Sequence, residues 1–549
     1  MVNLPGLPSR QQIGTLVEQV RRLPTTAQEA AVLVRAGVAP LTRPDRSAHA
    51  LLALRRYGIL GAGIRIATDR DPGMLGLVDE LGELTFGELD RRSNALANAW
   101  RQRGIDHDSV VALLCRDHRG LVEAMFAGGK VGAKVLLMNT GFAKPQFAAV
   151  CEREGVSALV YDVEFTEILD DVPAAIPRYL AWMDESDVEH ATLEQLIADT
   201  NDNPPPHPKS PGGLVLLTSG TTGAPKGAPR HVSSPFAAAQ FLDRIPLRPG
   251  ERVFLGAPLF HGTGLSQFLL ALTLGCTTLV RRRFDPRATL ETLAKYRVED
   301  LVVVPTMLQR ILALDEQEIR AHDTSALRIV FCAGSALPPE VGTRAMELFG
   351  DVIYNLYGST EVAVATVATP KDWKQAPGTV GRAPVGCTVR LYDDAGKRVT
   401  APETIGRVFV GSGLRFSGYT GGGSKEEIDG LLASGDVGHF DAAGLLFIDG
   451  RDDDMIVSGG ENVFPVEVEN LIVEHPDVAD AGVIGVPDDD FGQRLKAFVV
   501  VRDGATLDAD AVRAHVNANL ARHKVPRDVA FVDELPRNAT GKLLRDQLI

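Results

Sequence analysis

The sequence predicts an α/β protein: a large N-terminal domain of helix-covered, mainly parallel sheets, followed by a small α+β C-terminal domain. Short apolar runs alternate with amphipathic stretches from about residue 74, a pattern typical of parallel strands covered by helices. After Gly450 the segments become smaller and more mixed, which indicates an independent unit of about 100 residues. The chain of 549 residues has room for several domains. We therefore expect three parts: 1–73 as a helical N-terminal extension, 74–450, and 451–549.

Composition argues against several classes of function. The 57 basic and 71 acidic residues give a net charge of −14, which argues against general nucleic-acid binding. Met1–Arg10 lacks the charged start and apolar core of a signal peptide, and no apolar run reaches about 18 residues, so we expect a cytoplasmic protein with neither a signal peptide nor a membrane span. Five scattered cysteines without CxxC spacing predict reduced core residues and no zinc site: Cys115, Cys151, Cys276, Cys332 and Cys387.

Residues 1–66 contain two predicted amphipathic helices, Gln11–Arg22 and Ala48–Ile66. One interpretation is peripheral contact with the inner face of a membrane, with arginines at the headgroups and the apolar face in lipid. The alternatives are a helical pair packed on the main body, or a contact in a homodimer. Amphipathic helices more often serve cores, which favours the alternatives.

The next elements can be assigned from their patterns. Leu75–Asp79 and Glu83–Phe86 predict a hairpin, and Thr85 opens a predicted helix over Phe86–Arg101. Further apolar runs predict strands at Val110–Leu114, Lys134–Met138, Ala158–Tyr161, Arg252–Leu255, Asp300–Val304 and Arg328–Cys332. The C-terminal part predicts helices at Pro465–His475 and Ala509–Arg522, with strands at Val478–Val486, Leu495–Val501 and Val529–Val532. Ligands of parallel sheets bind beyond the carboxyl ends of the strands, so we expect the site there.

The segment Leu214–Pro229 predicts a loop that wraps polyphosphate. The apolar run Leu214–Leu217 indicates a buried strand, and hydroxyls, glycines and a lysine follow it. Glycines let backbone N–H groups approach an anion, hydroxyls donate hydrogen bonds, and lysine adds a positive charge. The residues concerned are Thr218, Ser219, Gly220, Thr221, Thr222, Gly223 and Lys226. The spacing is not that of the P-loop, so no kinase-like or GTPase-like fold is indicated; a flexible surface loop is the structural alternative.

Two later segments carry groups suited to a nucleotide. In Tyr354–Glu361, Tyr357 can stack on a base, Thr360 can bind the α-phosphate or a substrate carboxylate, and Glu361 is a hard oxygen ligand for Mg²⁺. Asp436 offers a carboxylate that accepts hydrogen bonds from both ribose hydroxyls.

The segment from Thr218 to Gly227 resembles the signature of the adenylate-forming superfamily, which includes acyl-CoA synthetases, peptide-synthetase adenylation domains and firefly luciferase. The resemblance covers residues 75 to 549, contains the complete Tyr-Gly-x-Thr-Glu motif with Gly358, and looks most like the acyl-CoA synthetase branch. The first 70 residues resemble, more weakly, extensions of long-chain fatty acid–CoA ligases.

This resemblance implies roles for further residues. Gly334, Ser335 and Ala336 would form the adenine-side loop; Arg451 would contact the ribose or a phosphate; Asp453 would be the hinge of a mobile C-terminal domain; Gly459 and Gly460 would border the thiol channel; and Lys542, in the Pro-x-x-x-Thr-Gly-Lys pattern, would be the catalytic lysine. His261 would lie near the substrate carboxylate, where it disfavours a cationic amino acid and suits an apolar acid; a histidine packed at a strand end is the alternative. The expected catalytic group is Lys542, Thr218, Thr360, Glu361 and His261.

The implied activity is ATP- and Mg²⁺-dependent conversion of a carboxylic acid to an acyl-adenylate, and then to an acyl-CoA. A medium- to long-chain fatty acid is the expected substrate. Three alternatives stay open: an adenylation enzyme that loads a separate carrier protein, a luciferase-type oxygenase, and an inactive acyl- or nucleotide-binding sensor. A sensor would be expected to lose Glu361 or Lys542, and the sequence contains both.

Overall fold

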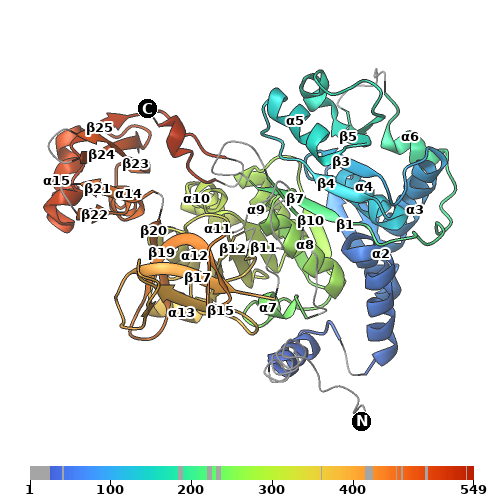
Figure 1. Cartoon of the computed structure of the whole chain (residues 1–549), viewed down its shortest axis with the longest axis horizontal. Helices are drawn as coiled ribbons and strands as arrows, with labels where there is room; N and C mark the ends of the chain where they lie inside the picture. Colours follow the sequence, from blue (N-terminus) through green and yellow to red (C-terminus); the bar gives the residue numbers. More distant parts are fainter. Residues whose placement is uncertain are drawn as a thin grey trace, which may run out of the picture.

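The computed structural model arranges the chain in four β-sheets with helices packed against them (Figure 1). It describes residues 25–39, 42–183, 190–218, 226–229, 236–359, 362–413, 425–452, 454–458, 461–488, 492–538 and 541–548.

The largest sheet has eight strands in the order β14–β13–β12–β11–β9–β10–β1–β2. Its six inner strands run parallel, and the two edge strands are antiparallel to their neighbours. The strands are β1 (Leu75–Asp79), β2 (Gly82–Thr85), β9 (Arg252–Leu255), β10 (Thr277–Val280), β11 (Asp300–Val303), β12 (Ile329–Cys332), β13 (Ile353–Tyr357) and β14 (Thr366–Ala368).

A second sheet has six strands in the order β6–β5–β3–β4–β7–β8, all parallel except β8. These strands are β3 (Val110–Leu114), β4 (Lys134–Leu137), β5 (Ala158–Asp162), β6 (Arg178–Trp182), β7 (Leu214–Thr218) and β8 (Lys226–Pro229).

The two sheets share one hydrophobic core, to which helices α3, α4 and α8 contribute. Phe126 of α4 stacks on Phe268 of α8, with ring centroids 6.0 Å apart. A separate cluster joins the other face of the large sheet to α9–α12, and another joins the second sheet to α5 and η1. The helices are α3 (Phe86–Gln102), α4 (Arg119–Val131), α5 (Lys144–Glu154), η1 (Val163–Leu169), α6 (Leu193–Ala198), α7 (Ala239–Leu242), α8 (Gly262–Leu274), α9 (Pro286–Tyr296), α10 (Pro305–Leu312), α11 (Glu316–Ala321), α12 (Pro339–Phe349) and α13 (Pro370–Gln375). These layers confirm the predicted fold class.

A third sheet, which the sequence did not reveal, is antiparallel and lies between the parallel sheets and the small domain in the chain. Its order is β16–β15–β17–β19–β18, with β20 paired to β19. The strands are β15 (Thr388–Tyr392), β16 (Arg398–Val399), β17 (Gly406–Gly411), β18 (Glu427–Ile428), β19 (Leu431–Phe440) and β20 (Leu446–Arg451). Several of these strands are short and half-exposed, so they produce no continuous apolar run.

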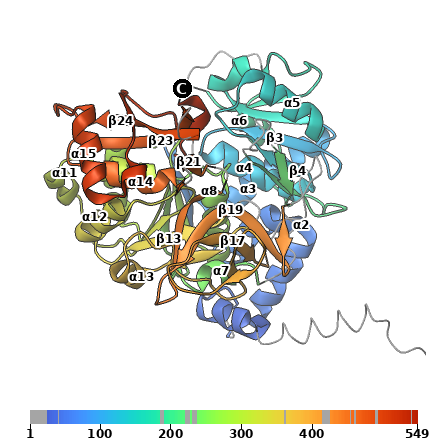
Figure 2. The ribbon, with the colours of Figure 1, turned by 60° about the vertical axis from the view of Figure 1, so that its left-hand side comes forward.

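The small C-terminal unit, orange to red in Figure 2, is an α+β structure with its own core. Its sheet has the order β22–β21–β24–β23, with β25 paired to β24. The elements are β21 (Ile456–Ser458), β22 (Glu461–Val463), α14 (Pro465–Val473), β23 (Val478–Asp488), β24 (Gly492–Val501), α15 (Ala509–Asn519), η2 (Arg522–Lys524), β25 (Asp528–Phe531) and η3 (Arg545–Gln547). All five elements predicted here are present; β24 starts three residues before the predicted Leu495.

Helix α2 (Pro44–Arg70) contains the predicted helix Ala48–Ile66 and bends at Gly58, whose φ is 67°. Its second half is buried against α4 and α8, whereas Leu51 and Leu52 in its first half are 41% and 48% exposed. A Cβ placed on Gly129 of α4 would lie 2.3 Å from the backbone nitrogen of Gly61 in α2, so the two helices touch backbone to backbone. The second half of α2 thus packs on the main body, and the predicted helix Gln11–Arg22 lies outside the described residues.

Within the described ranges, none of the helices combines the length and apolar character needed to span a bilayer. Thr85 caps α3 as predicted: its hydroxyl accepts from the Glu88 N–H at 3.2 Å, and the Glu88 carboxylate accepts from the Thr85 N–H at 2.8 Å.

A buried carboxylate joins the two parallel sheets. Asp117 follows β3, and its two oxygens accept the backbone N–H of Leu259, at 3.1 and 3.2 Å, in the connection from β9 to α8. Burial raises the pKa of Asp117 to about 7.

We expect Gly129→Ala to destabilise the protein by about 1–3 kcal/mol, because the new methyl group would separate α2 from α4. Urea unfolding would measure this. Gly73→Ala is the control, since its Cβ would meet only Asp71 Oδ1, at 3.5 Å. Equal stabilities of the two variants would contradict the close contact.

We expect Asp117→Asn to flatten the pH dependence of stability. The carboxyl pKa is about 7 in the folded protein against a reference of 3.8, so the folded state holds this proton more tightly. This tighter proton binding therefore stabilises the folded state fully below pH 3.8. The stabilisation is lost as the pH rises through 7, which lowers the free energy of unfolding by about 4 kcal/mol in total. Asparagine keeps a carbonyl acceptor for Leu259 and carries no charge.

The measurement is the free energy of unfolding at pH 5 and pH 8, with Asp108→Asn as the control on an 86% exposed side chain. The Asp117→Asn variant should gain stability over wild type at pH 8 relative to pH 5. An identical pH dependence in wild type and variant would refute the assignment.

Candidate active site

The predicted site segments follow the carboxyl ends of strands. Pro305 comes two residues after the end of β11, Gly334 two residues after β12, and Tyr357 is the last residue of β13. These three strands are parallel neighbours, so their carboxyl ends reach one edge of the large sheet. Thr218 ends β7 in the second sheet, opposite Lys226 at the start of β8, which places the predicted phosphate loop between these two strands.

Several predicted site residues lie outside the described residues: Ser219, Gly220, Thr221, Thr222, Gly223, Thr360, Glu361, Asp453, Gly459 and Gly460. For Thr218 and Lys226 the structure gives the strand pairing only. The roles of all these residues stay predictions.

The structure brings Tyr357, Asp436 and Arg451 together. The Tyr357 hydroxyl donates to Asp436 Oδ2 at 2.5 Å, and Arg451 Nη1 lies 3.8 Å from Asp436 Oδ1. Asp436 and Arg451 are opposite each other on β19 and β20, and the Asp436 N–H donates to the Ser434 hydroxyl at 3.1 Å. Burial, and then the Asp436 carboxylate, raises the pKa of Tyr357 well above its usual value. This cluster joins the edge of the large sheet to the third sheet and presents a fixed carboxylate there.

The chain turns back on itself directly after β13. A Cβ on Gly358 would lie 2.0 Å from the carbonyl oxygen of Ala363, so only glycine fits this close approach. The Ala365 N–H donates to the Tyr357 carbonyl at 2.9 Å. At the end of β12, Gly334 has a φ of 99°, a left-handed value that favours glycine. Ser335 and Ala336 follow it in the connection to α12.

His261 lies directly before α8, with its ring 4.6 Å from that of Phe260. Its Nε2 atom is buried and has no hydrogen-bond partner among the described residues. Burial lowers the pKa of His261 to about 4, so the ring is neutral near pH 7. It can therefore offer an uncharged polar atom to a ligand, but no positive charge.

Lys542 is exposed and lies on a turn that is held by its neighbours in the small domain. The Lys542 N–H donates to Asn538 Oδ1 at 2.9 Å, and the Asn538 N–H donates to the Lys542 carbonyl at 3.0 Å. Arg537 donates to the Gly541 carbonyl at 2.7 Å and pairs with Asp480. A Cβ on Gly541 would lie 2.3 Å from Thr306 Oγ1, at the start of α10. The Lys542 turn thus touches the large domain just beyond the carboxyl end of β11.

Sequence reasoning missed the supporting roles of two residues, Asp117 and Arg537. Asp117 has an ordinary local context, and Arg537 occupies a variable position of the Pro-x-x-x-Thr-Gly-Lys pattern, so no motif pointed to either role.

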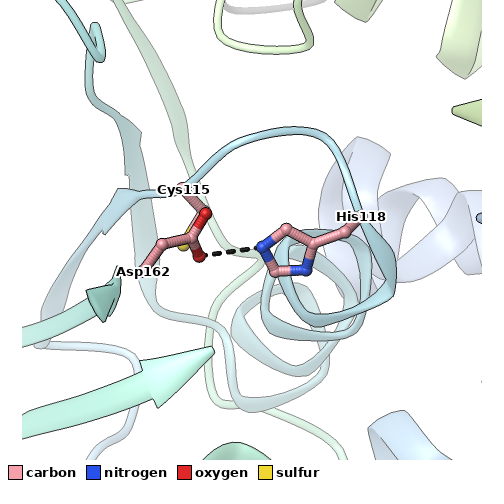
Figure 3. A group of neighbouring side chains, drawn as sticks. All are labelled: Cys115, His118 and Asp162. Carbon is pink, nitrogen blue, oxygen red and sulfur yellow. Dashed lines mark hydrogen bonds and ion pairs between the residues drawn. The ribbon is translucent and has the colours of Figure 1, made fainter. Parts of the chain in front are cut away.

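A buried group of metal-ligand residue types, Cys115, His118 and Asp162, lies at the carboxyl ends of β3 and β5 in the second sheet (Figure 3). His118 Nε2 lies 2.8 Å from Asp162 Oδ1, and the Gly120 N–H donates to His118 Nδ1 at 3.0 Å. An accepting Nδ1 implies a neutral ring whose Nε2–H donates to Asp162. Both ring nitrogens are therefore engaged, and the group fits a structural role at the start of α4. All five cysteines are free, four of them buried and Cys387 partly buried, as reduced residues would be.

Comparison with known proteins gives a consistent result. The AMP-binding enzyme family model matches residues 65–420, and the AMP-binding enzyme C-terminal domain model matches residues 467–542. The chain is similar to indoleacetate–CoA ligase of Aromatoleum aromaticum, with 32% identity over 87% of this chain and 95% of the relative. It is also similar to the fatty acid–[acyl-carrier-protein] ligase ScoC of Streptomyces coeruleorubidus, with 30% identity over 85% and 91% of the two chains.

Solved structures agree. Anthranilate CoA ligase AuaEII, in complex with anthranoyl-AMP, superposes with a TM-score of 0.79 and 26% identity, over 88% of this chain and 96% of that one. The family matches span the two parallel sheets and the small domain, and they bear out the resemblance read from the Thr218–Gly227 segment. The chain is therefore an enzyme that belongs to the AMP-binding, adenylate-forming family.

Proposed function

We propose that this enzyme activates an apolar carboxylic acid with ATP, forming an acyl-adenylate and pyrophosphate, and then transfers the acyl group to coenzyme A with release of AMP. The observation that carries the proposal is the position of the Lys542 turn, which contacts α10 at the same sheet edge that β13 and Tyr357 reach. We propose that the charge of Lys542 acts there, beside the candidate nucleotide site.

The cluster of Tyr357, Asp436 and Arg451 is the proposed ribose site. The Tyr357 hydroxyl donates a hydrogen bond to the Asp436 carboxylate at 2.5 Å, and the Asp436 backbone N–H donates one to the Ser434 hydroxyl. These bonds fix Asp436, so we propose that its carboxylate is preorganised to accept the two ribose hydroxyls. Arg451, opposite it on β20, adds positive charge for the phosphate side. Gly334, Ser335 and Ala336 are proposed to border the adenine.

In the first step a carboxylate oxygen attacks the α-phosphorus of ATP, and the bond to the pyrophosphate oxygen breaks. Negative charge spreads over the oxygens around phosphorus, so catalysis depends on positioning and on positive charge. Lys542 supplies that charge, with hydroxyls of the Thr218–Thr222 segment and Thr360 as hydrogen-bond donors. Glu361 is the proposed ligand for the Mg²⁺ that accompanies ATP.

In the second step the CoA sulfur attacks the acyl carbon and AMP leaves. We propose that the small domain turns about Asp453 between the steps, which removes Lys542 and brings Gly459 and Gly460 to the thiol path. The segment from β20 to β21 is short, Asp452 to Met455, which suits a hinge between domains.

The neutral His261 and the Phe260 ring support an apolar acid over an amino acid, because they supply no carboxylate to pair with an ammonium. We propose a medium- to long-chain fatty acid as substrate. The indoleacetate and anthranilate ligases among the similar proteins make aromatic acids the second candidate class. Similarity to a fatty acid–[acyl-carrier-protein] ligase keeps a carrier protein as the alternative acceptor. Cytoplasmic location, membrane contact through residues 1–66 and a homodimer stay predictions.

The decisive experiment is pyrophosphate release with ATP and Mg²⁺ across saturated acids from acetate to about twenty carbons, with indoleacetate and anthranilate added, each with and without CoA. We expect release that depends on an apolar acid and rises with CoA while AMP accumulates. Release that CoA does not stimulate would point to a carrier protein. Failure with all acids would contradict the proposed activity and favour the sensor.

We expect Lys542→Ala to reduce adenylate formation by about 100-fold or more, since one preorganised charge on the transition state is worth about 3 kcal/mol or more. ATP binding should change little, and thioester formation from supplied acyl-adenylate should survive. Single-turnover assays of the two half-reactions measure this, with Lys144→Ala as the control at a partly exposed lysine that pairs with Asp170. Adenylate formation at the wild-type rate would refute the role of Lys542.

A further inference from the structure

We propose that Thr306 is a positioning residue for the lysine turn: it seats Gly541, and this contact is needed to form the adenylate but not to transfer the acyl group. The inference rests on the proposed two-step function.

The contact between the domains is close at this point. Gly541 is buried, with a φ of 74°, and a Cβ built on it would lie 2.3 Å from Oγ1, 2.7 Å from Cγ2 and 3.1 Å from Cβ of Thr306. Thr306 is the second residue of α10, directly after Pro305. Figure 1 shows the red terminal segment leaving the small domain in the direction of α10. Only a residue without a side chain leaves room for this approach.

In the turn, hydrogen bonds of its described residues link the position of Gly541 to that of the lysine. Two hydrogen bonds close it between Asn538 and Lys542, and Arg537 ties the Gly541 carbonyl to Asp480 on β23. Consecutive Cα atoms are about 3.8 Å apart, so a shift of Gly541 moves the start of the Lys542 side chain by a similar amount. A misplacement of about 1 Å can cost a factor of about 100 in rate.

Thr306 is placed to act in one half-reaction only. It belongs to the large domain, beyond the carboxyl end of β11, whereas Gly541 belongs to the small domain. When the small domain turns and withdraws Lys542, the contact between Gly541 and Thr306 must open. Acyl transfer to the thiol then proceeds without it.

The test is a pair of substitutions, of which the second should partly restore the adenylate formation that the first removes. Gly541→Ala should slow adenylate formation by about 100-fold and leave thioester formation from supplied acyl-adenylate within about twofold. Thr306→Ala in the same chain removes Oγ1 and Cγ2 and leaves the Cβ at 3.1 Å, so it should recover about tenfold. Recovery stays partial, because the left-handed φ still strains alanine.

The matched control is Gly504→Ala. Gly504 also lies in the C-terminal unit and has a φ of 78°, but a Cβ there meets nothing within 4 Å. Gly504→Ala introduces the same kind of backbone strain but no contact with Thr306, so adenylate formation should stay within about twofold of wild type. A loss as large as that of Gly541→Ala would assign the effect to strain and overturn the inference. The inference would also be overturned if Thr306→Ala failed to restore adenylate formation in Gly541→Ala, or if Gly541→Ala slowed both half-reactions equally.

A second measurement needs no substrate and so separates this inference from the proposed function. In Thr306→Cys/Gly541→Cys the two thiols should lose two hydrogens to diamide and form a disulfide, detected by mass and reversed by dithiothreitol. The control pair is Thr306→Cys/Gly504→Cys, which should not crosslink. Absence of the Thr306–Gly541 crosslink would overturn the inference, whichever acid the enzyme takes.

Discussion

The parallel run of inner strands in the large sheet is the constraint on which the candidate site depends. β11, β12 and β13 pair residue by residue in parallel, so their carboxyl ends reach the same edge. β11 and β12 are buried along their whole length and β13 in part, so their side chains are used largely for packing. Polar and flexible residues are therefore left to the segments that follow the strands, where Thr306, Gly334 and Gly358 lie. The candidate site residues lie at this edge because the strand side chains inside the sheet are taken up by packing.

The same constraint explains why so much of the fold could be predicted. Strands that are buried on both faces have continuous apolar sequences, which are easy to recognise. For this reason Val110–Leu114 was predicted with the bounds that β3 has in the structure. Local hydrogen bonding fixes helix starts, and Thr85 was predicted to open α3 for that reason. In the third sheet, β16 and β18 escaped prediction since they have two residues each and produce no periodic pattern.

For the site, the sequence identified residue types but not their contacts. Tyr357, Asp436 and Arg451 were each predicted near the nucleotide, yet the bond between Tyr357 and Asp436 depends on how β19 of the third sheet meets β13. Asp117 was missed because its partner is remote: Leu259 is 142 residues away in the chain. No local pattern can reveal a carboxylate or hydroxyl whose role is fixed only by chain folding.

The proposed reaction places opposite demands on the surface between the two domains. It must fix Lys542 for the first step and then release it, so a large apolar interface, which would hold one arrangement permanently, does not suit it. The contact of Gly541 with Thr306 is close but small. Burial raises the pKa of Glu340 on α12, and the carboxylate of Glu474 after α14 raises it further, so an acidic group of the small domain acts on one of the large domain. A contact that is close over a small area therefore suits both demands of the proposed reaction, because it can position Lys542 for the first step and still open within a turnover.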